Sequence, residues 1–427
     1  MLLRFGCSNF LSIRDYQEIS LVATKKKDAA AQLREVPGLE LKILPAAAIY
    51  GANASGKTNF IQAIDFLKET ISGQNVARDA SEGVTRAPFK LGKQYALQPT
   101  EVDVDFIHEE VHYHYGFACN DEIILEEWLY AFPNNQRQVW FHRNAKEGTE
   151  YYFGRQLKGR NKTISDLTTP NTLFLSSAAR NNHHQLSPIH SYFKGRIAYR
   201  SSELNRPQNY EKFLLNEKFR AEIVSFMKNA DIGIDDIRVE EEDLDEKHLA
   251  IHRDLEELFS KHLSSFPQLS EKDKLRKILF SHKSADGSNV DLDMELESRG
   301  TITLLNLLGP ALDALANGKL LVVDELDSSV HPLLSRRLVH LFNAIADRTN
   351  RGQLIFTTHD TNLLDKKVLR RDQIWFTEKS KDGATCLYPL SDIKTRKGDN
   401  FEKGYLSGRY GAIPYLGTFD SANELVG

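Results

Sequence analysis

The chain has 427 residues, 41% of them apolar and 27% charged, which is the composition of a globular protein with a sizeable core and up to three domains. Its formal net charge of −4 argues against a protein that coats nucleic acid through a strongly basic field. The three cysteines are too far apart for a zinc spacing or a disulfide framework. Because the sequence shows neither a run of about eighteen apolar residues nor a signal-peptide pattern, we expect no membrane span and a cytoplasmic location.

The first half of the chain alternates as β-strands do. Strands are predicted over residues 3–10, 16–22 and 46–50, and an antiparallel meander over 101–107, 110–117 and 123–130, continuing near 138–142 and 151–153. His112 and His114 share one face of this meander. Since no third ligand stands at a suitable spacing, aromatic packing is favoured over metal binding there.

The stretch from Leu44 to Asn59 carries the strongest motif. An apolar strand is followed by a glycine-bounded loop and by a helix that begins near Lys57, and Gly51–Thr58 satisfies G-x-x-x-x-G-K-[ST]. Glycines let backbone N–H groups turn toward an anion, and the helix aims its positive end at the same anion. The sequence therefore predicts a phosphate-binding loop, in preference to a glycine-containing turn with no ligand.

Each residue type in this loop suits one part of a nucleotide. Lys57 adds a positive charge near the β- and γ-phosphates, and the Thr58 hydroxyl suits a Mg²⁺ ion. The expected ligands are ATP and Mg²⁺. The candidate nucleotide-binding residues are Gly51, Asn53, Ser55, Gly56, Lys57, Thr58 and Asn59.

The character of the sequence changes at about residue 201. Residues 210–230 and 248–263 have charged, amphipathic helical patterns, with an acidic run from Glu240 to Glu246 between them. The segments are too short for a sustained coiled coil, so we expect a compact helical insertion or lever over 201–288. It would separate an N-terminal lobe, 1–200, from a C-terminal lobe, 289–427.

The C-terminal lobe returns to an α/β pattern. A strand is predicted at 290–296, helices at 301–316 and 331–345, and buried strands at 319–323, 353–358 and 373–378. The apolar run Leu320–Val323 ends in Asp324 and Glu325. Ligands of open α/β sheets bind beyond the carboxyl ends of the strands, so we expect Asp324 to reach the Mg²⁺ that Thr58 holds. Glu325 is then the candidate general base for an attacking water.

The next apolar strand ends in Thr357-Thr358-His359. A histidine at a strand tip beside phosphates can sense the γ-phosphate or hold the water, and His359 is the third candidate catalytic residue, with Lys57 and Glu325.

The order of these motifs resembles ABC-type ATPases of the RecF/SMC class. The sequence looks in particular like the stand-alone ATPases of bacterial antiphage and abortive-infection operons, the OLD, AbiL, RloA and PtuA types. Glu297–Thr301, Asp327–Pro332, and the opening Asn9–Asp15 and closing Gly404–Pro414 segments carry this resemblance together with the P-loop and Asp324-Glu325. It implies an α/β, ABC-type P-loop NTPase head with a mixed central sheet, an antiparallel β subdomain and a helical insertion.

The resemblance also implies a dimer. Ser298 and Gly300 match the serine and second glycine of the ABC signature, which contacts the γ-phosphate of ATP held by another subunit, although Glu297, Arg299 and Thr301 depart from its usual residues. ATP would then hold together a homodimer or a higher homo-oligomer. Asn182 and Gln185 are the candidates for the Q-loop glutamine position.

Three functions stay open at this point. One is a nucleotide-driven switch in antiphage defence that controls a separately encoded, operon-linked effector such as a nuclease, since no TOPRIM or His-Asn-His pattern follows His359. A second is a RecF-like DNA-repair or DNA-end-binding ATPase. The third is an effector that uses residues 397–414 on nucleic acid, against which a structural C-terminal wrap is favoured.

Contact with nucleic acid would have to rest on local basic patches. The candidates are Lys25–Lys27 and a cluster at residues 366–371, each of which is more simply explained as solvated surface.

Overall fold

The computed structural model describes residues 1–26, 28, 30–36, 38–73, 83–146, 148, 150–200, 210–230, 233–243, 274–344, 351–395 and 398–414. The chain divides into two compact units. One contains residues 1–202 and 313–427, and the other contains residues 203–312. The division into an N-terminal lobe, an insertion and a C-terminal lobe with the expected boundaries stays a prediction.

The first unit contains a seven-stranded antiparallel sheet in the order β10-β9-β8-β7-β6-β1-β2. Its strands are β1 (Leu2–Ser8), β2 (Gln17–Ser20), β6 (Thr100–His108), β7 (Val111–Cys119), β8 (Ile124–Phe132), β9 (Gln138–Asn144) and β10 (Glu150–Phe153). The meander expected from the alternating residues is therefore present, and β1 joins its edge by pairing with β6.

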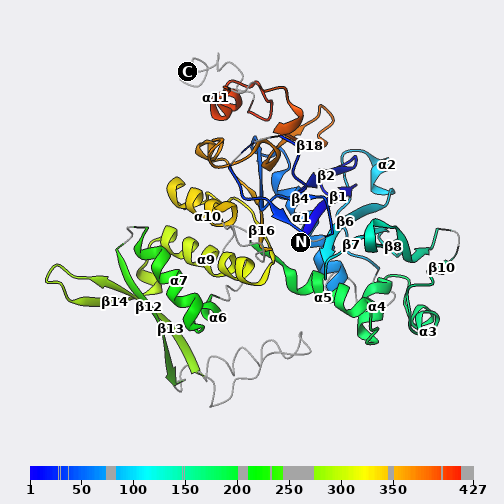
Figure 1. The fold of residues 1–427 in the computed structure, drawn as a ribbon, viewed down its shortest axis with the longest axis horizontal. Helices are drawn as coiled ribbons and strands as arrows, with labels where there is room; N and C mark the ends of the chain where they lie inside the picture. Colours follow the sequence, from blue (N-terminus) through cyan, green and yellow to red (C-terminus); the bar gives the residue numbers. More distant parts are fainter. Residues whose placement is uncertain are drawn as a thin grey trace, which may run out of the picture. The chain divides into compact units, whose positions relative to one another are not determined.

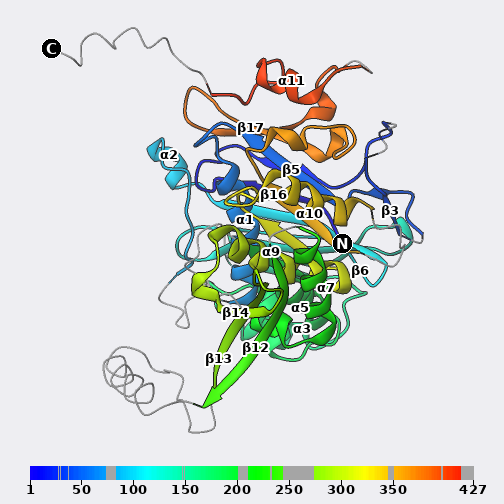
Figure 2. The same cartoon turned by 90° about the vertical axis from the view of Figure 1, so that its left-hand side faces the viewer.

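A six-stranded mixed sheet in the order β11-β15-β16-β5-β17-β18 carries the phosphate-binding motif. β11 (Ile197–Arg200), β15 (Leu320–Val323), β16 (Gln353–Thr357), β5 (Ala46–Gly51) and β17 (Ile374–Lys379) are parallel, and β18 (Thr385–Pro389) runs antiparallel to β17. Figure 2 shows β5 between β16 and β17. All described residues of β5, β15 and β16 are buried, as expected for parallel strands covered on both faces.

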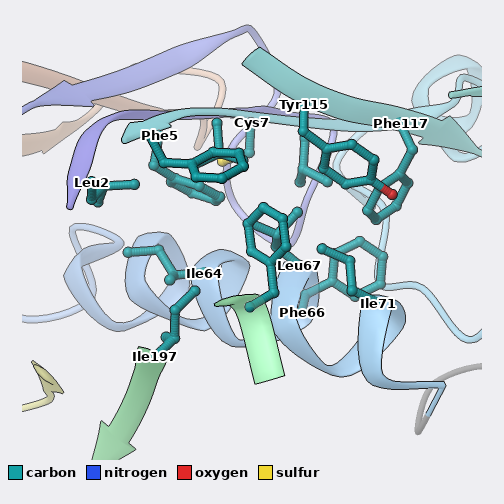
Figure 3. Packing of buried hydrophobic residues seen from close by; sticks show 14 of the residues in the cluster. Leu2, Phe5, Cys7, Ile64, Phe66, Leu67, Ile71, Tyr115, Phe117 and Ile197 are labelled. Carbon is teal, nitrogen blue, oxygen red and sulfur yellow. The ribbon is translucent and has the colours of Figure 1, made fainter. Parts of the chain in front are cut away.

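Helix α1 (Lys57–Ser72) packs between the sheets because its apolar residues recur at helical spacing. Its buried face includes Phe60, Ile64 and Leu67. Figure 3 shows side chains of α1 pointing toward Phe5 of β1 and toward side chains of β7, and the rings of Phe5 and Phe60 meet edge to face with centroids 5.7 Å apart. Fully burying such a side chain contributes about 1.5–3 kcal/mol, so this contact anchors the helix that follows the P-loop.

Smaller elements complete the first unit. They are β3 (Arg34–Glu35), β4 (Lys42–Ile43), α2 (Lys93–Ala96), α3 (Asn161–Asp166), α4 (Phe174–Arg180), α5 (Leu186–Arg196), α10 (Pro332–Ala344), α11 (Phe401–Leu406) and the short 3-10 turns η1 (Pro133–Asn135), η3 (Thr361–Leu363), η4 (Arg371–Gln373) and η5 (Leu390–Asp392). The N-terminus of α4 is capped by Glu127 of β8, whose carboxylate accepts the backbone N–H groups of Phe174 and Leu175 at 2.6 and 3.0 Å.

The second unit contains α6 (Glu211–Leu214), α7 (Glu217–Lys228), and a three-stranded antiparallel sheet of β12 (Ile234–Asp243), β13 (Lys274–Lys283) and β14 (Asn289–Asp293). Figure 1 shows these strands as a long ribbon beside α7. The 3-10 turn η2 (Met294–Leu296) leads into α9 (Arg299–Asn317), which continues into the first unit.

The insertion differs from the expected pair of helices. The helix expected at 210–230 is present as α6 and α7, but the acidic run expected to separate two helices begins inside β12. Ile237 and Val239 alternate with charged residues there and pair with Phe280 and Ile278 of β13. This apolar pairing on one face explains why the segment forms a strand. The helix expected at 248–263 lies outside the described residues.

Candidate nucleotide-binding site

The P-loop joins the carboxyl end of β5 to α1, and two of its glycines have no room for a side chain. A Cβ on Gly51 would lie 2.3 Å from Thr377 Oγ1, and one on Gly56 would lie 2.1 Å from Thr385 Oγ1. Gly56 also has a φ of 105°, which L side chains rarely adopt. The threonines of β17 and β18 therefore lie against the loop where any side chain on these glycines would have to fit.

Lys57 turns back over this loop. Its Nζ donates to the carbonyl oxygens of Gly51 and Ala52 at 3.0 and 3.1 Å. Burial lowers the pKa of Lys57, and the nearby carboxylates of Asp324, Glu325 and other acids oppose that shift. A buried ammonium whose hydrogen-bond acceptors among the described residues are carbonyl oxygens gains from an anionic partner, and a triphosphate is such a partner.

Asp324 follows the buried strand β15 and lies beside the start of α1. Its Oδ1 accepts the Thr58 hydroxyl at 3.2 Å and the Thr357 hydroxyl at 2.6 Å. Burial raises the pKa of Asp324, and these two hydrogen bonds lower it only in part. The Asp324 carboxylate is buried and hydrogen-bonded to hydroxyl groups rather than paired with a cation. A carboxylate oxygen beside a threonine hydroxyl oxygen is a pair of ligands that suits Mg²⁺.

Glu325 stands one residue beyond Asp324 in a turned backbone. Its φ is 54°, an uncommon value for a residue other than glycine, and its N–H donates to Thr357 Oγ1 at 2.7 Å. The side chain is exposed, whereas that of Asp324 is buried. The two acids therefore have different surroundings. Asp324 faces the threonine hydroxyls, and Glu325 faces solvent, from which an attacking water would come.

Thr357 was missed in the sequence analysis although it contacts both acids. Its single hydroxyl donates to Asp324 and accepts from the Glu325 amide. The signal was present, since Thr357 ends the buried strand β16, which is parallel to β15. The register that places its hydroxyl between two consecutive residues of the next strand is not encoded in a local pattern.

His359 lies at the tip of β16, on the same side as the P-loop. Its backbone N–H donates to the two carboxylate oxygens of Asp327 at 3.2 and 3.3 Å. Partial burial lowers the pKa of His359, and the charge of Lys57 lowers it further. The structure thus brings Lys57, Thr58, Asp324, Glu325 and His359 to one edge of one sheet.

Three other predicted ligand residues differ in their contacts. Asn53 is exposed in the P-loop, whereas Ser55 Oγ lies 2.6 Å from Thr377 Oγ1, in the protein interior. Asn59 donates to Ser12 Oγ at 2.7 Å. Ser55 and Asn59 therefore fasten the loop to its surroundings.

The signature-like residues Ser298 and Gly300 lie at the start of α9, in the other compact unit. Ser298 is exposed, and its Oγ accepts the backbone N–H of Thr301 at 3.1 Å, which is the bond of a helix N-cap. Their contact with ATP of another subunit stays a prediction. Of the Q-loop candidates, Gln185 uses its carbonyl oxygen to accept the Lys158 amide at 2.7 Å.

The face of the meander that carries His112 and His114 is a closed network of charges. Asp103, Asp105 and His114 offer ligand atoms within 4.8 Å of one another, a spacing that a metal ion could use, so the expectation that no further ligand stands near the histidines was wrong. Arg4, however, donates to both aspartates at 2.7 and 2.8 Å, and His112 Nε2 lies 2.8 Å from Asp105. His112 also stacks on Phe132 and His114 on Tyr130. These contacts agree with the packing role favoured for the pair.

The basic cluster at 366–371 does not form one solvated patch. Arg370 is buried and pairs with Asp372 at 2.9 Å, and Arg371 pairs with Asp28 at 2.8 Å. Both arginines are therefore structural, which is a correction to the surface role expected for them, while Lys366 and Lys367 are exposed.

The segment that ends the described chain packs on the strand that precedes the P-loop. Tyr405 stacks on Phe376 with ring centroids 5.5 Å apart and meets Tyr50 at 5.8 Å. The hydroxyl of Tyr405 donates to the carbonyl of Ala412. This packing favours the structural wrap over a nucleic-acid surface at 397–414.

Residues 46–365 match the family model described as "AAA domain, putative AbiEii toxin, Type IV TA system". Among solved structures, the chain is similar to an SMC head domain from Thermotoga maritima (14% identity, 92% of this chain and 99% of that one, TM-score 0.38). It is also similar to an SMC head bound to the C-winged helix domain of ScpA (14%, 91% and 97%, TM-score 0.39) and to one derived from Pyrococcus furiosus (13%, 96% and 98%, TM-score 0.36). No curated protein matches the chain. Among the described helices, none is both long and apolar enough to cross a membrane.

Proposed function

The chain belongs to the AAA-domain family whose description names AbiEii and type IV toxin–antitoxin systems, and we propose that it binds and hydrolyses ATP with Mg²⁺ as a nucleotide-driven switch. In this proposal, Lys57 and the P-loop backbone hold the phosphates. Thr58 and Asp324 hold the metal, which supplies charge neutralisation and orientation of the triphosphate.

One observation carries the proposal. Thr58 and Asp324, from segments far apart in the chain, lie 3.2 Å apart between Oγ1 and Oδ1, at the carboxyl ends of the parallel strands of one mixed sheet. A phosphate-binding loop and a carboxylate-tipped strand that meet in this way form the two halves of a Mg²⁺–triphosphate site. Glu325, exposed beside them, is suited to orient the attacking water, and His359 to contact the γ-phosphate.

The switch would act through association. Ser298 and Gly300 of one subunit would complete the site that holds ATP at the P-loop of another. ATP would then favour a closed homodimer, and hydrolysis would release it. In an antiphage or abortive-infection system, this change would control a separately encoded effector, such as a nuclease, in the cytoplasm. The net charge of −4 favours this switch over the RecF-like alternative, which would need a basic surface for DNA.

The enzymology is tested with Glu325→Gln, which keeps the shape of the side chain and removes the base. We expect phosphate release to fall by about 100-fold or more while ATP binding is retained and an ATP-dependent dimer accumulates. Glu122→Gln, an exposed residue in the β7–β8 turn, is the matched control and should behave as wild type. Unchanged turnover in Glu325→Gln would remove this residue from the base role.

The family description favours a second candidate, in which the chain itself is the toxic component of a two-gene system. Expression of the chain alone distinguishes the two. Growth arrest without any neighbouring gene, lost in Glu325→Gln, supports the toxin, whereas arrest only with a co-expressed neighbour supports the switch.

A further inference from the structure

The residue that departs most in chemistry from the signature pattern is Glu297, directly before Ser298. A carboxylate at this position is unexpected. The first N–H groups of α9 and the positive end of its dipole attract anions, so an unpaired Glu297 carboxylate could bind there in place of a phosphate. A negative charge there would also repel the phosphate that the signature is expected to contact.

Glu297 is held by the strand next to it. Its Oε1 lies 2.5 Å from His282 Nε2 of β13, and only 7% of the Glu297 side chain is exposed. The neighbouring Ser298 and Arg299 are exposed. Of these two consecutive residues, Glu297 therefore has a buried carboxylate and Ser298 an exposed hydroxyl.

The histidine is in turn fixed by its sheet. His282 pairs with Val290 of β14, and the adjacent Ser281 hydroxyl donates to Asp291 of β14 at 2.5 Å. β13 also pairs along its length with β12, the other long strand of the insertion. The position of the imidazole therefore follows the position of the three-stranded sheet.

We propose that His282 is a positioning residue that holds the Glu297 carboxylate away from the N-terminus of α9, so that this helix end stays open to the γ-phosphate of a second subunit. The inference rests on the proposed function, because it assumes that Ser298 and Gly300 act on ATP bound by another copy. It gives the insertion sheet a direct effect on the site: a shift of β13 that breaks the His282–Glu297 contact frees a carboxylate that competes with ATP.

The first test is His282→Ala. We expect kcat to fall about tenfold and ATP-dependent dimer formation to weaken, with the ATP affinity of the isolated subunit unchanged, because the P-loop is intact. Arg276→Ala removes the exposed Arg276–Glu241 pair of the same sheet, far along β13 from His282, and is the matched control, expected to keep wild-type turnover.

The decisive variant is the double substitution His282→Ala with Glu297→Gln. If the freed carboxylate is the cause, removing its charge restores kcat to within about threefold of wild type. A general loosening of the sheet predicts no such rescue, so a double variant as slow as His282→Ala overturns the proposal. Wild-type turnover in His282→Ala overturns it as well.

Two further variants separate this inference from the function beneath it. Glu297→Gln alone folds with the same hydrogen-bonding shape and should turn over ATP at least as fast as wild type; a tenfold loss would contradict the proposal even if His282→Ala failed to fold. Ser298→Ala tests the signature itself. If it leaves turnover and dimer formation unchanged, the contact in trans fails, whereas a slow Ser298→Ala with a normal His282→Ala rejects the histidine alone.

Discussion

In the six-stranded sheet, similar residues at the two ends of the parallel strands are in opposite states. At the carboxyl end, Asp324 has a pKa raised by burial, and Lys57 has a pKa lowered by burial. At the amino end, Arg371 donates to Asp28 from Nε and a terminal nitrogen at 3.0 and 2.8 Å. These bonds lower the pKa of Asp28 and raise that of Arg371.

The difference distinguishes a binding site from a structural ion pair. Charges that satisfy one another gain little from a ligand, while buried charges that have only hydroxyl or carbonyl partners are stabilised when a ligand of opposite charge arrives. Substitutions at the two ends should therefore have opposite consequences for function and for folding.

The largest effect is expected from Lys57→Ala. Loss of the ammonium should reduce phosphate release by about 1000-fold and weaken ATP binding, because no other described cation donates to the P-loop carbonyls in its place. Titration calorimetry with ATP and a phosphate-release assay measure both. The exposed Lys367→Ala serves as control, and ATP binding that survives in Lys57→Ala would contradict the site.

Asp324→Asn should separate activity from stability. Turnover is expected to fall about 100-fold, since a neutral amide is a poor Mg²⁺ ligand. The carboxyl has a raised pKa, so its ionised form is penalised in the folded state at neutral pH. Removing that charge should therefore raise the free energy of unfolding without ATP, by about 1 kcal/mol, as urea titration measures. A lower free energy of unfolding in Asp324→Asn would mean that neighbouring groups already stabilise the Asp324 charge in the folded protein.

Arg371→Ala should show the reverse pattern. Removing a donor that makes two hydrogen bonds to a mostly buried carboxylate is expected to cost about 1–3 kcal/mol of unfolding free energy. Turnover per folded molecule should stay at the wild-type value. Lys162→Ala, which breaks the exposed Lys162–Asp166 pair, should cost less than about 0.5 kcal/mol.

The smallest effect is a pH dependence of stability. Because the pKa of Asp28 is lowered from 3.8 in the folded protein, its contribution is complete above the unfolded pKa and is lost as the pH falls below it. The urea midpoint of the wild type should therefore drop more steeply below about pH 4 than that of Asp28→Asn. Parallel pH curves for the two proteins would show that the Asp28–Arg371 pair does not contribute to the pH dependence of stability.

Much of the candidate nucleotide-binding site could be predicted from the sequence because its signals are local. The P-loop spacing, the acids after Leu320–Val323 and the histidine after Gln353–Thr357 each stand within one strand and the turn that follows it. The rule that ligands bind at the carboxyl ends of parallel strands then joins them.

Other features depend on which strands become neighbours. The Asp28–Arg371 pair and the position of Thr357 between two acids follow from sheet order and register, which no short stretch of sequence contains. The strand β12 was missed because charged residues dominate it, and β13 because basic residues interrupt its apolar ones. Their few apolar residues, such as Ile237 and Phe280, become informative only once they are paired.

The strand order also has a consequence for how the chain is made. β5, which leads into the P-loop, lies between β16 and β17, and both of these come from residues 353–379. During synthesis the apolar strand must therefore wait for most of the polypeptide to leave the ribosome before it gains either neighbour. A nascent chain that stalls in the insertion would therefore present Ala46–Gly51 without its two neighbouring strands, and an unpaired apolar strand is prone to aggregation.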